Sequence, residues 1–162
     1  MNYTKSGFTL IELLAVVLII AILTSIAVPQ YRRSVQRAES MEALTNLRTI
    51  FDSAKRYRAA NSEAPLKLHG LDVSFFDADT PGNSSFNIGK FHYTFTTNGF
   101  SACRISAGSY ANTYCFTMYY NYKSGSAQYK DLLACTSSTP KYSWLCEALS
   151  TSKLGSMYVI GS

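Results

Sequence analysis

An uncharged apolar run near the N-terminus constrains this chain more than any other feature. From residue 13 to residue 30 no side chain is charged, and three polar residues interrupt the apolar sequence, Thr24, Ser25 and Gln30. As one helix, residues 8–28 would be roughly 31 Å long at ~1.5 Å per residue, which matches the apolar thickness of a bilayer. The run therefore predicts a helix that lies in lipid or inside a bundle of helices.

Two ordinary interpretations of this run fit it poorly. A secretory signal would use Lys5 as its positive start and residues 25–27 as its cleavage site, but Glu12 lies where its apolar stretch should begin. A permanent membrane anchor would be followed by three arginines between residues 32 and 37, which would place the rest of the chain in the cytoplasm. The cysteines of the C-terminal half favour an oxidising compartment instead.

The residues at the front of the run resemble a known processing site. The stretch Gly7-Phe8-Thr9-Leu10-Ile11-Glu12-Leu13-Leu14 is similar to the cleavage site of type IV prepilins and the related secretion pseudopilins. In that family a membrane peptidase cuts after the glycine of a short basic leader and N-methylates the new first residue. The resemblance implies a leader of residues 1–7, cleavage between Gly7 and Phe8, and a methylated Phe8.

The resemblance also assigns parts to the rest of the chain. Residues 8–29 would form the hydrophobic helix of the membrane and filament core, and residues 30–162 a head that includes the amphipathic half of the helix. Pro29 corresponds to a helix-bending proline, and Glu12 to an acid at the fifth mature position. We expect Glu12 to attract the amine of Phe8 on a neighbouring subunit, because an unpaired carboxylate is unfavourable in an apolar core. The alternative for Glu12 is a solvated acid at the headgroups, near the positive end of the helix dipole.

The next segment predicts an amphipathic helix. Residues 31–60 contain no proline or glycine, and apolar residues recur every three or four positions. One face would bury this set: Val35, Ala38, Met41, Leu44, Leu47, Ile50 or Phe51, Ala54 and Tyr57. Such a face suits packing against a sheet.

Alternating residues then predict that sheet. After a connecting loop over residues 61–90, with one short element around 71–76, strands are expected at 91–96, at about 100–106 and at 114–122, and a short fourth strand after the turn at 123–126. The fold class is therefore α+β: a long N-terminal helix, half apolar and half amphipathic, packed on an antiparallel sheet of about four strands. This is the layout of the pilin fold.

Four cysteines follow the apolar run, and none forms a C-x-x-C pair, so zinc and redox sites are not indicated. Sequence alone allows three pairings. We expect Cys103 to pair with Cys115, because they lie on consecutive strands, and Cys135 with Cys146, which would close a C-terminal loop. Family members often carry such a cysteine-closed loop on the filament surface.

No catalytic group, cofactor or metal is predicted. Residues 77–83 resemble a calcium loop only faintly, because Pro81 stands where a ligand is expected and Ile88 where the bidentate acid should be. His69 and His92 have no acids or cysteines at ligand spacing. The twelve tyrosines could bind glycans or stack on DNA bases, but packing within the sheet is the preferred interpretation.

These inferences predict a structural subunit of a type IV pilus filament that serves adhesion, motility or DNA uptake and has no enzymatic activity. The precursor would lie in the bacterial inner membrane, and many copies would form the extracellular filament. Its partners would be a prepilin peptidase and the inner-membrane assembly machinery. The alternative is a type II secretion pseudopilin or a minor pilin of a competence or secretion filament. DNA as a partner is supported only by four basic residues that form no evident cluster, Arg104, Lys123, Lys130 and Lys141.

Overall fold

The computed structural model describes residues 7–68, 70–75, 84–106 and 113–161. It divides into two compact units, Met1–Ala38 and Glu39–Ser162, and each is considered by itself. Lys5 and the rest of the leader before Gly7 lie outside the described residues.

One helix, α1, runs from Leu10 to Asn61 and continues through Pro29. Its first part forms the first unit. An 18-residue stretch of α1 has a mean hydropathy of 2.8 and none of it is buried, so the helix is long and apolar enough to cross a membrane. The apolar helix predicted from the sequence is present. The sequence also predicted a kink or local melting at Pro29. Helical structure continues through Pro29, so the helix is not melted there, although proline has no N–H to donate to the preceding turn.

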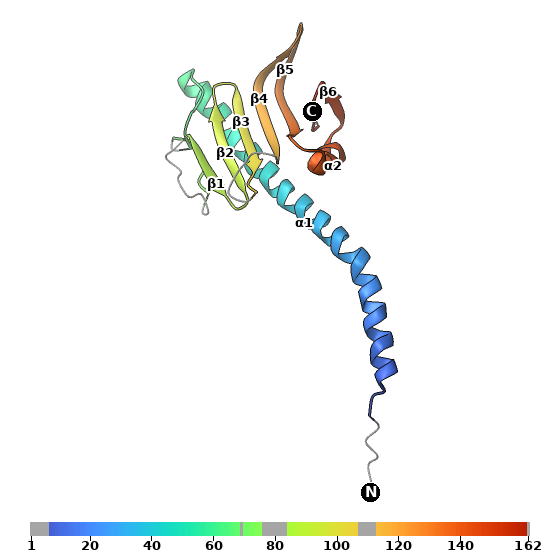
Figure 1. Ribbon diagram of the computed structural model, residues 1–162. Helices are drawn as coiled ribbons and strands as arrows, with labels where there is room; N and C mark the ends of the chain where they lie inside the picture. The colour runs from blue at the N-terminus through green and yellow to red at the C-terminus, as the bar shows by residue number, and fades with distance from the viewer. Residues whose placement is uncertain (1–6, 69, 76–83, 107–112, 162) are drawn as a thin grey trace. The chain divides into compact units, whose positions relative to one another are not determined.

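The second unit contains an antiparallel sheet with the strand order β1-β2-β3-β4-β5-β7-β6 (Figure 1). Seven strands lie within the described residues: β1 Ser85–Ile88, β2 Phe91–Thr96, β3 Gly99–Arg104, β4 Tyr114–Ser124, β5 Ala127–Ser137, β6 Ser152–Leu154 and β7 Met157–Val159. The α+β class is confirmed, but the expected count of about four strands is wrong. Strands of three or four residues are too short to show alternation in a sequence, which is why β1, β6 and β7 were missed.

The C-terminal half of α1 covers one face of this sheet. Alternate residues of β2 and of the first part of β4 are buried, as the period of two predicts. Across from them α1 buries eight residues: Ser40, Ala43, Leu44, Leu47, Ile50, Phe51, Ser53 and Ala54. The predicted apolar face is right from Leu44 to Ala54. It is wrong at Met41, which is 49% exposed, and at Ala38, which is also exposed, because the buried face of the helix begins at Ser40 and Ala43 instead.

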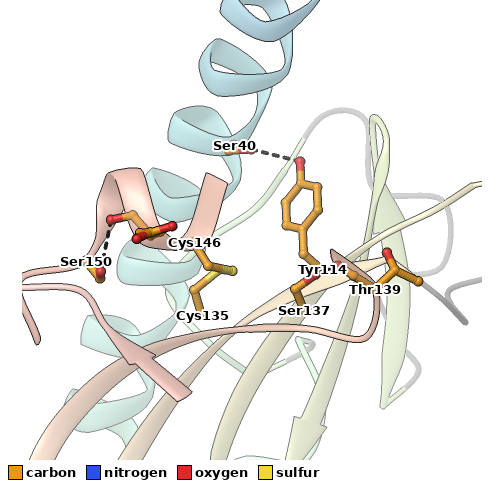
Figure 2. Close-up of a disulfide and its surroundings, with 8 residues drawn as sticks. Ser40, Tyr114, Cys135, Ser137, Thr139, Cys146 and Ser150 are labelled. Atoms are coloured by element: carbon orange, nitrogen blue, oxygen red, sulfur yellow. Dashed lines mark hydrogen bonds between the residues drawn. A yellow bond between two sulfur atoms is a disulfide. The ribbon is translucent and has the colours of Figure 1, made fainter. Parts of the chain in front are cut away.

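A second helix, α2, spans Pro140–Leu149, where the sequence predicted a loop. Pro140 occupies the start of the helix, a position that tolerates proline because its missing N–H would have no partner there. Cys146 of α2 is bonded to Cys135 of β5, and Figure 2 shows this disulfide beside the core. The other disulfide joins Cys103 and Cys115, which face each other across β3 and β4 with Cα atoms 4.0 Å apart.

Candidate processing and assembly site

The residues around the expected cleavage point precede α1 and are open to solvent. Gly7, Phe8 and Thr9 have no helical or strand structure, and the Phe8 side chain is 81% exposed. A Cβ atom added to Gly7 would meet nothing within 4 Å. A peptidase could therefore bind this segment in an extended form without unfolding any part of the chain.

Thr9 and Glu12 form a capping box at the start of α1. The Glu12 carboxylate accepts hydrogen bonds from the Thr9 backbone N–H at 2.8 Å and from the Thr9 hydroxyl at 2.7 Å. In return the Glu12 N–H donates to Thr9 Oγ1 at 3.3 Å. This reciprocal pattern satisfies N–H groups that the first turn of a helix otherwise leaves without partners.

Sequence reasoning missed this role for Thr9. It predicted a partner for Glu12 only in another subunit, whereas in the uncleaved chain the carboxylate is already hydrogen-bonded to Thr9. The signal was available, because threonine followed three residues later by glutamate before an apolar run is the pattern of a capping box. Pro29 takes no part in this site, since it lies roughly 25 Å farther along the helix at ~1.5 Å per residue.

The two polar residues in the middle of the apolar stretch bond to their own helix. The Thr24 hydroxyl donates to the carbonyl of Ile20 at 2.8 Å, and the Ser25 hydroxyl donates to the carbonyl of Ile22 at 2.6 Å. Internal partners remove most of the cost of placing a hydroxyl in apolar surroundings. This part of α1 is therefore suited to lipid or to other helices on every side.

A different acid, Glu39, ties α1 to the sheet within the second unit. Its carboxylate accepts from Lys90 at 2.5 Å and from Arg104 at 2.7 Å, and the side chain is only 19% exposed. Burial acts to raise the pKa of Glu39, but the Lys90 hydrogen bond and the Arg104 charge outweigh burial and hold that pKa below its usual range. Arg104 also donates to the Tyr114 hydroxyl at 3.3 Å, and Tyr114 is bonded to Ser40 at 2.8 Å (Figure 2). This network fixes the orientation of α1 on the sheet.

Comparisons with known proteins agree with the N-terminal geometry. The family described as the prokaryotic N-terminal methylation motif matches residues 3–28. The type II secretion system core protein G of Aeromonas hydrophila is 31% identical over 43% of this chain and 48% of its own length. The type IV major pilin protein PilA of Myxococcus xanthus is 43% identical over 35% of this chain and 26% of its own length. Core protein G of Vibrio cholerae is 28% identical over 54% of this chain and 60% of its own length. The chain therefore matches about a quarter to three-fifths of these relatives.

The methylation motif and the relatives point to the same kind of protein. Over its N-terminal part this chain is similar to a type IV pilin and to type II secretion core proteins G. The apolar, unburied helix is consistent with membrane insertion of such a subunit. The relatives named above are a pilin and secretion-system core proteins.

The other candidate groups from the sequence do not form a metal or DNA site within the described residues. Within the described residues no three His, Cys, Asp or Glu side chains come together as metal ligands. The faint calcium loop at 77–83 and His69 lie outside the described residues, and His92 Nδ1 is bonded to the Asn87 amide oxygen at 2.7 Å. Arg104, one of the four basic residues considered for DNA, is only 14% exposed and is held by Glu39.

Proposed function

We propose that this chain is a subunit of a helical filament of the type IV pilus kind, built from many copies of itself. The observation that carries the proposal is the position of the methylation motif on a helix whose apolar stretch is entirely unburied. A soluble subunit could not leave that much apolar surface in water, so another apolar phase must cover it. Lipid would cover it before assembly, and the same helix of neighbouring copies afterwards. The extracellular filament and the inner-membrane assembly machinery are part of this proposal.

We further propose that residues 1–7 are a leader and that a prepilin peptidase cuts between Gly7 and Phe8 and methylates Phe8. Residues 8–29 then form the filament-core helix and residues 30–162 the head. The exposed, non-helical segment from Gly7 to Thr9 supports this assignment.

After cleavage, Glu12 would exchange partners. In the uncleaved chain the carboxylate is satisfied by Thr9, which lowers its cost near the membrane surface. In the filament it would attract the cationic amine of Phe8 on a neighbouring subunit. At ~4 Å and an effective dielectric constant of ~20 that attraction is about 4 kcal/mol before desolvation. A mis-stacked subunit would leave both charges unpaired, so the pair would define the axial register.

The cleavage assignment is tested at Gly7, where substitution cannot disturb the fold, because a side chain there meets no neighbouring atom. We expect Gly7→Val to leave full-length precursor in the membrane of cells that contain a prepilin peptidase. Gly7→Ala, with the smallest side chain, is the graded control and should be processed more slowly than the native chain. Normal processing of Gly7→Val on a gel would refute the assignment.

A type II secretion pseudopilus is the second candidate, because two of the three relatives described above are core protein G. The pilus is placed first because two disulfides in the head suit a filament that is exposed outside the cell. Electron microscopy of cells with and without the gene, together with an assay of secreted proteins, separates the two. Loss of surface filaments supports the pilus, and loss of secretion with intact filaments supports the pseudopilus. If cells without the gene lose neither surface filaments nor secretion, both candidates are contradicted.

A further inference from the structure

An open pocket lies on the head at the start of β3, beside the β4–β5 hairpin. β3 pairs with β4 only as far as Gly99, which lies opposite Tyr119, whereas β4 continues to Ser124. Beside this free stretch of β4 is a pocket of about 440 Å³, a volume within the ~300–1,000 Å³ typical of small-ligand sites. The pocket is lined by Asn98, Tyr119, Asn121, Tyr122 and Lys123.

The floor of this pocket is held in place by backbone contacts. The carbonyl of Asn98 accepts a hydrogen bond from the N–H of Tyr120 at 2.9 Å, which ties the β2–β3 turn to β4. The next residue, Gly99, lies so close to β4 that an added Cβ would be 1.9 Å from the carbonyl oxygen of Met118. Only glycine permits this approach. The backbone of Asn98 is therefore positioned beside β4 before any ligand arrives.

Two tyrosine rings form the walls. The ring centroids of Tyr119 and Tyr122 are 5.1 Å apart, and the ring planes are inclined by 47°. Tyr129 supports Tyr122 from the neighbouring strand, with a centroid distance of 6.4 Å. Both wall residues are half-buried, so part of each side chain is accessible. The pocket thus offers flat, pre-positioned aromatic surface.

The polar groups of the pocket are available for a ligand. Asn98 and Asn121 are exposed, and within the described part of the chain neither side-chain amide forms a hydrogen bond. Each amide offers two N–H donors and a carbonyl acceptor. A vicinal pair of sugar hydroxyl groups is the natural complement, because each hydroxyl donates and accepts.

From these contacts we infer that the pocket binds a terminal sugar residue of a glycan. The C–H face of the sugar stacks on Tyr119 or Tyr122, since those slightly positive hydrogens meet the negative face of the ring. The amides of Asn98 and Asn121 bind its hydroxyl groups, and Lys123 at the rim accommodates a carboxylate on an acidic sugar. The pocket lies within the Glu39–Ser162 unit, so this inference is independent of filament assembly.

Single-stranded nucleic acid fits the pocket less well. Aromatic stacking would suit its bases, but the phosphate backbone requires several available cations. Lys123 is the one charged residue in the pocket lining. Lys130 lies opposite Asn121 on β5 and adds a second cation. The other nearby cations already have contacts, because Arg58 lies over the Tyr120 ring at 5.0 Å and Lys55 is paired with Asp131 at 2.6 Å.

The test uses the full chain in detergent micelles, so that neither cleavage nor polymerisation affects the result. Saturation-transfer NMR is recorded with the methyl glycosides of glucose, galactose, mannose, N-acetylglucosamine and N-acetylneuraminic acid. We expect at least one to bind, and Tyr119→Ala and Asn121→Ala each to weaken that binding by about tenfold. Tyr122→Phe keeps a stacking ring and should retain most of the glycoside binding. Tyr158→Phe, on β7, is the matched control and should bind like the native chain.

Three results would overturn the inference. The first is the absence of transfer to every glycoside, and the second is binding that neither Tyr119→Ala nor Asn121→Ala weakens. The third is tighter binding of an oligo(dT) strand that is lost in Tyr119→Ala, which would make the pocket a nucleic-acid site. The fluorescence of Trp144, the single tryptophan, verifies that each variant is folded. Because Asn121 is exposed, Asn121→Ala preserves the test even if Tyr119→Ala is unstable.

Discussion

The two halves of α1 form one continuous helix, but the first half is exposed and the second half is partly buried. None of the 18-residue apolar stretch in the first half is buried, whereas every buried residue of the helix lies at Ser40 or beyond. The second half has a cover within its own chain, namely the sheet, and its apolar residues are confined to the face that the sheet contacts. The first half is apolar on all sides and has no such cover. A helix that is apolar all round therefore signals a partner outside the chain, and an amphipathic helix signals one inside it.

Glu12, at the start of the first half of α1, and Glu39, at the start of the second half, also differ in where their partners lie. Among the described residues Glu12 is bonded only to Thr9, the residue that caps its own helix, while Glu39 is bonded to Lys90 of the β1–β2 turn and Arg104 of β3. We expect a change at Glu12 to act on assembly and a change at Glu39 to act on the stability of the head.

The largest expected effect is at Glu12. Glu12→Val should give a processed, membrane-stable subunit that forms no regular filaments alone, because the carboxylate that would attract Phe8 is gone. Glu42→Val, an exposed acid on the head half of the same helix, is the matched control and should assemble. Filaments are counted by electron microscopy. Abundant regular filaments of Glu12→Val would show that the carboxylate has no docking role.

A second pair of variants separates charge from capping at the same site. Glu12→Gln keeps the capping-box geometry and loses the charge, whereas Thr9→Ala loses the cap and keeps the charge. The docking proposal predicts that Glu12→Gln fails to assemble and that Thr9→Ala assembles. If Glu12→Gln assembles and Thr9→Ala does not, the role of Glu12 is to cap the helix and not to dock a neighbouring subunit.

Truncating one leucine in each half of α1 should change the stability of the head by different amounts. Leu47 is fully buried against the sheet, so Leu47→Ala should lower the free energy of unfolding of the head by about 2–5 kcal/mol. Leu18 is 63% exposed, so Leu18→Ala should leave that free energy unchanged. Urea unfolding of the full chain in detergent, followed by Trp144 fluorescence, measures both. Equal effects at the two positions would contradict the division of the helix.

Glu39→Gln should have a smaller effect on the head. It removes the charge that pairs with Arg104, which is 14% exposed and would be left without its acid. We expect a loss of about 1–3 kcal/mol in the free energy of unfolding, because the hydrogen bond joins charged groups that are partly desolvated. The same urea titration measures it, and an unchanged midpoint would show that the network contributes nothing to the position of α1.

The smallest effect is the dependence of head stability on pH. The hydrogen bonds from Arg56 and Ser53 lower the pKa of the Asp72 carboxyl to about 2, and the pKa of Glu39 is also lowered. The unfolded chain therefore takes up protons first on acidification. Stability from these groups should be fully present above about pH 5 and should fall progressively toward pH 2. Urea midpoints across this range should decline less steeply in Glu39→Gln than in the native chain.

The sequence predicted those elements that carry a long periodic pattern. The apolar run, the burial of Leu47 and the strand at Phe91–Thr96 were all readable, because each repeats its period several times. The short strands β1, β6 and β7 were not, because three or four residues hold too little alternation. The last part of the head was also misread, since Pro140 suggested a loop although it begins α2.

At the N-terminus the sequence located the residues but not their contacts. The spacing of Gly7, Phe8 and Glu12 indicated processing, yet the local bond between Thr9 and Glu12 was not predicted, because Glu12 was assigned a partner in another subunit. The pocket proposed to bind a glycan could not be predicted from the sequence. Asn98 and Asn121 are brought together only because β3 begins at Gly99 while β4 runs on to Ser124.

The most direct test of the central claim is the intact mass and N-terminal sequence of the mature protein, purified from a bacterium that contains a prepilin peptidase. If the first half of α1 is a processed assembly helix, the mature chain begins at Phe8 and carries one added methyl group on its amine. A mature chain that begins at Val28 would show that the apolar run is a cleaved secretory signal. A chain that still begins at Met1 beside an active peptidase would equally contradict the account.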